Sequence, residues 1–104
     1  MASSSERELF NIRNFDGTNF TLWKEQIQDV LVQKKQFKLV EGLNAKRTDM
    51  SDANWVELDA LAKTTIRLHL AKSVYFTVVN ETTSHNLWKK LCSTYEKETT
   101  SNKL

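Results

Sequence analysis

The residues in this chain that could do chemistry are two histidines and one cysteine. His69 and His85 lie 16 positions apart, without the spacing of three or four residues that places two metal ligands on one helix face. His69 falls on an apolar stripe, where a partly buried, hydrogen-bonded histidine is expected, and His85 is expected to be solvated. Cys92 also falls on an apolar stripe, which favours a small buried side chain over a nucleophile. The sequence therefore predicts no catalytic residue, no metal site and no cofactor.

Glycine and cysteine are too scarce to build other common sites. Gly17 and Gly42 are the only glycines, and their wide separation leaves no glycine-rich loop to hold a phosphate. One cysteine excludes an internal disulfide and a cysteine-rich zinc site. Each of the three tryptophans lies on an apolar stripe, which favours core packing over a ligand cage. No small-molecule substrate is expected.

The strongest charge feature is a basic cluster in which Glu41 is the only acidic residue. Its five members are Lys34, Lys35, Lys38, Lys46 and Arg47. A solvated face and a weak, non-specific contact with RNA phosphates are both open interpretations. The first is favoured because no aromatic platform is interleaved with the bases, as binders of single strands require.

Length and composition predict one all-α domain that holds these residues. The chain has 104 residues, 39% of them hydrophobic, with no proline and two glycines. An all-β sandwich or barrel needs more turn residues than this. A net charge of +2 is too small for a nucleic-acid-binding composition and, with ten aromatic residues, argues against disorder. The expected architecture is a single compact bundle of four to five helices.

Five segments show the spacing of apolar residues that is typical of helices. They are residues 20–35, one turn at 36–40, a long helix from 51 or 52 to about 70, residues 73–79, and a helix from 83 or 84 through Tyr95. Residues 75–79 also have β propensity, but a strand without a partner is not stable, so a helix is favoured there.

Polar residues at the starts of these segments are candidate caps. Asn19, Ser51 or Asp52, Ser73, and Thr83 or Ser84 are the expected N-caps, and Gly42 is expected to end the short turn before it. The long helix starting at 51 or 52 is expected to make contacts on two sides through a wide stripe. That stripe comprises Trp55, Leu58, Leu61, Ala62, Thr65, Ile66 and His69.

The expected organisation is a flexible lead-in at 1–14, one helical domain at 15–97 and a polar tail at 98–104. No apolar run reaches the 18 residues of a membrane span, and the first residues lack the apolar core of a signal peptide. The sequence therefore predicts no membrane contact and a reduced, intracellular compartment.

With these residues laid out, the sequence resembles the N-terminal part of Gag from plant copia-type LTR retrotransposons (Pseudoviridae). Three motifs carry the resemblance, in the family's order and spacing: Phe-x-Gly-x-Asn-Phe-x-x-Trp, Trp-x-x-Leu-Asp followed by Ile-Arg-Leu-His-Leu, and Leu-Trp-x-x-Leu-x-x-x-Tyr. The matching residues are Phe15, Gly17, Asn19, Phe20, Trp23, Trp55, Leu58, Asp59, Ile66, Arg67, Leu68, His69, Leu70, Leu87, Trp88, Leu91 and Tyr95. Most are expected to lie in the core.

The resemblance implies a fold like a capsid N-terminal domain and a structural, non-enzymatic role. The implied partner is the protein itself, which would self-associate weakly into the cytoplasmic virus-like particle that packages the element's RNA. It further implies that a second helical half and a zinc knuckle follow Leu104. Two alternatives stay open: a host-retained Gag fragment that binds another protein or inhibits assembly, and a module that contacts RNA weakly through the basic cluster.

Overall fold

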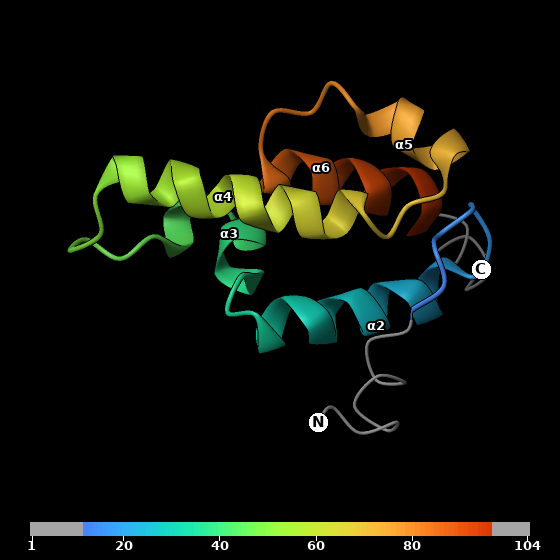
Figure 1. Ribbon diagram of the computed structural model, residues 1–104, viewed down its shortest axis with the longest axis horizontal. Coiled ribbons are helices and arrows are strands. Elements are labelled where there is room, and N and C mark those ends of the chain that lie inside the picture. The colour runs from blue at the N-terminus through green and yellow to red at the C-terminus, as the bar shows by residue number, and fades with distance from the viewer. Residues whose placement is uncertain (1–11, 97–104) are drawn as a thin grey trace, which may run out of the picture.

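The chain folds as an all-α bundle, as the sequence predicted. The computed structural model describes residues 12–96 (Figure 1), so the tail predicted at 98–104 and most of the predicted lead-in lie outside the described residues. The α-helices are α2 (Phe20–Gln33), α3 (Phe37–Glu41), α4 (Asp52–Arg67), α5 (Lys72–Val78) and α6 (Ser84–Leu91). A 3-10 turn, η1 (Leu43–Ala45), follows α3, and a π-helical segment, η2 (Cys92–Glu96), continues α6. Helix α5 covers residues 73–78 of the predicted 73–79, so the prediction of a helix over a strand is confirmed.

The short helix α3 lies at the centre of the bundle. It contacts α2, α4 and α6, and α4 and α6 also contact each other. Figure 1 shows α2 below α3, with α4 and α6 on the other side and α5 beyond α6. The one-turn helix therefore joins α2 to the pair formed by α4 and α6.

Helix α2 buries the stripe that its sequence predicted. Its buried residues are Phe20, Trp23, Ile27, Val30 and Leu31. The helix ends at Gln33, two residues before the predicted end, because Lys35 has a φ of 61°. The N–H of Lys35 donates to the carbonyl of Val32, and that of Gln36 donates to the carbonyl of Leu31. This is a Schellman motif with lysine at the position where glycine is usual. Because no glycine stands there, the sequence did not indicate the end of the helix.

Two of the predicted caps differ from the structure. Asn19 stands at the start of α2 with a φ of 56° and makes no capping hydrogen bond through its side chain. Helix α5 starts from Ala71 rather than from Ser73, because the chain before it is extended and the Ala71 N–H is bonded to the carbonyl of Phe15. Ser51 and Thr83 do cap α4 and α6, since their hydroxyls accept from backbone N–H groups three residues later.

The segment before α2 is hydrogen-bonded to the segment after α4. Phe15 N–H donates to the carbonyl of His69 at 2.9 Å, and the Ala71 N–H donates to the carbonyl of Phe15 at 2.8 Å. The indole Nε1 of Trp23 donates to the same His69 carbonyl at 3.1 Å. We call this arrangement the Phe15 clasp.

Aromatic rings pack around the Phe15 clasp. The Phe15 ring lies 5.3 Å from Phe20, 5.1 Å from Trp23 and 4.8 Å from Tyr95, measured between centroids. Ile12 belongs to the same core although the sequence placed it in the lead-in. These contacts bring the first and last described segments of the chain together.

Helix α4 buries a narrower face than its sequence predicted. Trp55, Ala62 and Ile66 are buried as expected. Leu58 and Leu61 are 37% and 52% exposed, so this part of the predicted stripe faces solvent. Helix α4 still contacts more than one neighbour, α2, α3 and α6.

Replacement of Trp23 by alanine should destabilise the protein strongly. The indole is 3% exposed and donates the hydrogen bond within the Phe15 clasp, so its loss leaves a cavity and removes a donor. We expect the free energy of unfolding to fall by about 3–5 kcal/mol, out of about 5–15 kcal/mol for a domain of this size. Urea denaturation followed by far-UV circular dichroism measures this loss. Leu22→Ala is the control, because Leu22 is 50% exposed and its removal should cost less than about 0.5 kcal/mol.

Candidate functional site

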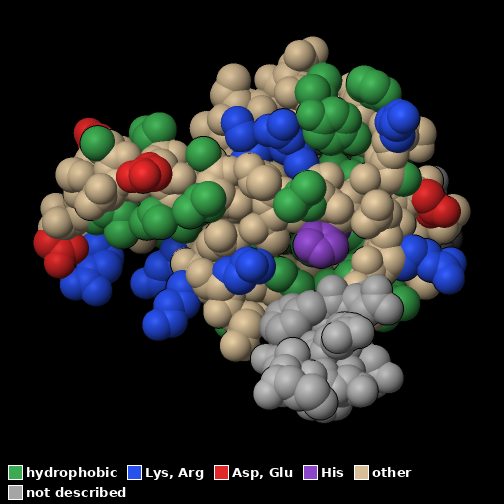
Figure 2. Space-filling model, in the orientation of Figure 1, with side chains coloured by type: hydrophobic (Ala, Val, Ile, Leu, Met, Phe, Trp, Pro, Cys, Tyr) green, Lys and Arg blue, Asp and Glu red, His purple; other side chains and the backbone are tan. Residues whose placement is uncertain are grey.

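The structure divides the predicted basic cluster into two groups. Lys34, Lys35 and Lys38 are exposed at the end of α2 and in α3, and none of them forms an ion pair within residues 12–96. Lys46 and Arg47 follow η1, and both lie close to carboxylates. Figure 2 shows lysine and arginine side chains as separate groups on the visible face, with no continuous basic surface.

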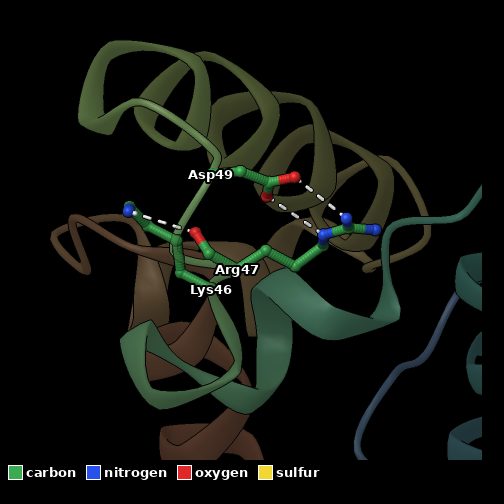
Figure 3. Close-up of polar contacts among 3 residues, drawn as sticks. All are labelled: Lys46, Arg47 and Asp49. Atoms are coloured by element: carbon green, nitrogen blue, oxygen red, sulfur yellow. Dashed lines mark hydrogen bonds and ion pairs between the residues drawn. The ribbon is translucent and has the colours of Figure 1, made fainter.

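Acidic neighbours offset the charge of the second group. The guanidinium of Arg47 donates from Nε to Asp49 Oδ1 at 3.1 Å and from a terminal nitrogen to Asp49 Oδ2 at 2.9 Å (Figure 3). Lys46 Nζ lies 3.5 Å from Asp52 Oδ1. Bidentate pairing fixes the orientation of a guanidinium, so Arg47 is less available to a phosphate than the exposed lysines. Three of the five predicted residues therefore remain as a candidate contact for nucleic acid.

A buried carboxylate, which the sequence placed in a family motif without indicating its role, joins α4 to α6. Asp59 is 8% exposed, and Ser84 is completely buried. The Ser84 hydroxyl donates to Asp59 Oδ1 at 2.5 Å, and the Ser84 N–H lies 3.2 Å from each carboxylate oxygen. Negative charge at a helix N-terminus is stabilising, so Asp59 fixes the start of α6. The sequence did contain a signal for this role. Asp59 follows Trp55 by one helical turn on a buried face, and a buried carboxylate needs a hydrogen-bond partner.

Both histidines have structural contacts. His69 is half-buried, and its Nδ1 lies 2.7 Å from the carbonyl of Thr65, which matches the expected hydrogen-bonded histidine. His85 was expected to be solvated, but its Nδ1 lies 2.8 Å from the carbonyl of Val40. A Cβ at Gly42 would lie 3.1 Å from that ring nitrogen, so a larger residue there would press against the His85 ring.

The sulfur of Cys92 lies in a setting that disfavours the thiolate. Cys92 is half-buried, and burial raises the pKa of its thiol. Nearby, Lys24 Nζ donates to Glu96 Oε2 at 2.6 Å, and this bond raises the pKa of Lys24. Within the described part of the chain, no three His, Cys, Asp or Glu side chains come together as metal ligands would.

The residues that carry the three sequence motifs are mostly core residues. Those that the structure buries are Phe15, Phe20, Trp23, Trp55, Asp59, Ile66, Leu70, Leu87, Trp88 and Leu91. Tyr95 is partly buried against this core. Leu58 and Asn19 were expected in the core and are exposed. Gly17 has a φ of 105°, a conformation that favours glycine.

Comparison with known proteins identifies the family. The family model for the gag-polypeptide of LTR copia-type matches residues 27–104. The chain belongs to this family. The model begins after the first motif, so the match does not depend on Phe15, Gly17 or Trp23.

A curated relative of this copia-type Gag chain is the Retrovirus-related Pol polyprotein from transposon TNT 1-94 of Nicotiana tabacum. It is 32% identical over 96 residues, which are 91% of this chain and 7% of the relative. The Gag chain thus spans a small part of the polyprotein that it matches. No solved structure matches it. The helices within residues 12–96 are all too short or too polar to cross a bilayer.

Removal of the Asp59 carboxylate should destabilise this Gag domain. Asp59→Ala leaves the buried N–H and hydroxyl of Ser84 without their acceptor. Hydrogen bonds to charged groups contribute about 1.5–3 kcal/mol each, and an unsatisfied buried donor costs about 1–3 kcal/mol, so we expect a loss of at least about 2 kcal/mol in thermal or urea unfolding. Glu57→Ala changes an exposed carboxylate of the same helix and is the matched control. Equal losses in the two variants would contradict this role.

Binding of RNA should be weak and should depend on the exposed lysines alone. Three phosphate contacts give a slope of log K against log salt of about −2 on single strands. We expect Lys34→Gln, Lys35→Gln and Lys38→Gln together to abolish this binding, measured by fluorescence anisotropy with a labelled RNA. Lys46→Gln with Arg47→Gln is the control and should have a smaller effect. Sub-micromolar, sequence-selective binding would overturn this expectation.

Proposed function

We propose that this chain is a structural module of copia-type Gag that self-associates to build a cytoplasmic virus-like particle. The observation that carries the proposal is the family match over residues 27–104. The all-α bundle fits a capsid N-terminal domain, and both histidines are hydrogen-bonded to backbone carbonyls in structural roles. The partner of the module is another copy of itself.

Particle growth requires that each contact between copies be weak. A strong contact that forms in the wrong place cannot be undone, whereas several weak contacts made together hold a finished shell by avidity. A net charge of +2 provides little repulsion between copies. The exposed lysines of the basic cluster add a weak contact with packaged RNA to this proposed role.

The isolated chain should therefore self-associate only when concentrated. We expect a dissociation constant between about 10 μM and 1 mM, which is about −7 to −4 kcal/mol. Sedimentation velocity from about 5 μM to 1 mM should show a monomer that gives way to larger species without stopping at a dimer.

Two results of this sedimentation series would count against the proposal. A closed dimer with nanomolar affinity is not a unit of a growing shell and would favour a host-retained Gag fragment that binds a partner or inhibits assembly. A strict monomer at 1 mM would place the assembly contacts outside these 104 residues.

A further inference from the structure

A groove lies along one side of α4. It has a volume of about 410 Å³ and is bounded by α4, by Leu43 of η1 and by Thr82 and Thr83 of the loop before α6. Trp55 lies at its base with 8% exposure, and Val56 and Ala60 form its α4 wall. Leu43 and Val56 are 68% and 66% exposed. The groove is therefore apolar and open to solvent.

A row of exposed leucines lies on the other side of the same helix. Leu58, Leu61 and Leu68 are 37%, 52% and 70% exposed. With 3.6 residues per turn, they fall within a sector of about 80° on α4, and Leu61 is about 140° around the axis from Val56. We call this row the leucine ridge. The ridge and the groove face different directions, so they cannot meet within one molecule.

The two surfaces hold just over half of the large hydrophobic side chains that are exposed in residues 12–96. Of the nine large hydrophobic side chains that are exposed in residues 12–96, five belong to the groove or to the ridge. Exposed apolar surface that is concentrated in this way is typical of an interaction site. Because both surfaces use one helix, a concave apolar surface and a convex one are held in fixed relation to each other.

We infer that the groove receives the leucine ridge of a second copy of this chain, an inference that rests on the proposed function and names its contact surfaces. A row of leucines on a helix is the usual occupant of an apolar groove. The charges agree with this pairing at the Lys63 end of the groove, whereas the exposed carboxylate of Asp52 lies at the other end. Lys63 lines the groove and donates to the carbonyl of Thr82 at 3.1 Å, whereas Glu57 is exposed on the ridge side of α4. Glu57 of one copy and Lys63 of the next would attract each other at the edge of the contact.

The geometry of the pairing determines the kind of assembly. A contact between two different surfaces leaves one groove free at one end and one ridge free at the other, so it adds further copies instead of closing as a two-fold dimer does. Five large apolar side chains make up this contact, far fewer than the roughly 20–30 residues a side of a standard interface. The contact is therefore weak, as growth of a shell requires.

The test uses one variant for each surface and measures sedimentation of the 104-residue chain. Val56→Glu places a charge in the groove, and Leu61→Glu places one on the ridge. We expect each to weaken self-association more than tenfold. Leu22→Glu is the matched control, since Leu22 is 50% exposed on α2, and it should associate like the unaltered chain. All three positions are exposed, so melting temperatures should stay within a few degrees and show that the variants are folded.

Mixing the two variants gives the decisive measurement. The groove of Leu61→Glu and the ridge of Val56→Glu are both intact, so an equimolar mixture should form a one-to-one dimer with the original affinity and nothing larger.

Exchange of the edge charges in one chain, Glu57→Lys with Lys63→Glu, should restore the association that either change alone weakens.

Three results would overturn the inference. If both variants associate like the unaltered chain, the groove is left to a partner of another kind, while self-association itself still holds. If only one variant loses association while the other associates like the unaltered chain, the surface altered in the first variant pairs with itself. A strict monomer of the unaltered chain at 1 mM removes both the inference and the proposed self-association.

Discussion

The carbonyl of His69 is the point on which the bundle depends. It accepts from the N–H of Phe15 and from the indole of Trp23, which come from the chain before α2 and from α2 itself. Because α4 ends just before His69, this single oxygen fixes three segments relative to one another. The Phe15 ring then lies against Trp23 and Tyr95, so η2 joins the same centre. The helices of this chain are not cross-linked by a disulfide. The hydrogen bonds to the His69 carbonyl therefore hold them in register.

The helices could be predicted from the sequence because each one buries a single periodic stripe. The stripes of α2 and α6 are buried as predicted, and the caps at Ser51 and Thr83 follow from residue type alone. Helix ends were less predictable. The ending of α2 depends on Lys35 in a left-handed conformation, which its residue type does not indicate, and the start of α5 depends on a hydrogen bond to Phe15, 56 positions earlier in the chain.

The candidate sites were less predictable than the helices, for a related reason. Charge spacing placed five bases in one cluster, but Asp49 and Asp52 offset two of them through the fold of the loop before α4. Asp59 matched a family motif, but its role was not predicted because its partner, Ser84, is distant in the sequence. The exposure of Leu58 and Leu61 depends on how much of α4 its neighbours cover, and periodicity gives only which residues share a face.

The described chain enters and leaves the bundle at the same end, where Phe15 meets Tyr95 and Lys24 meets Glu96. In a longer polypeptide, both ends of such a domain join the rest of the chain at the same place. Tension between the flanking segments would then act first on this aromatic contact, and the domain would unfold from that end. The end that bears η1 would carry none of that force until the Phe15 clasp had opened, and could stay docked to a neighbour while the polypeptide on both sides moved.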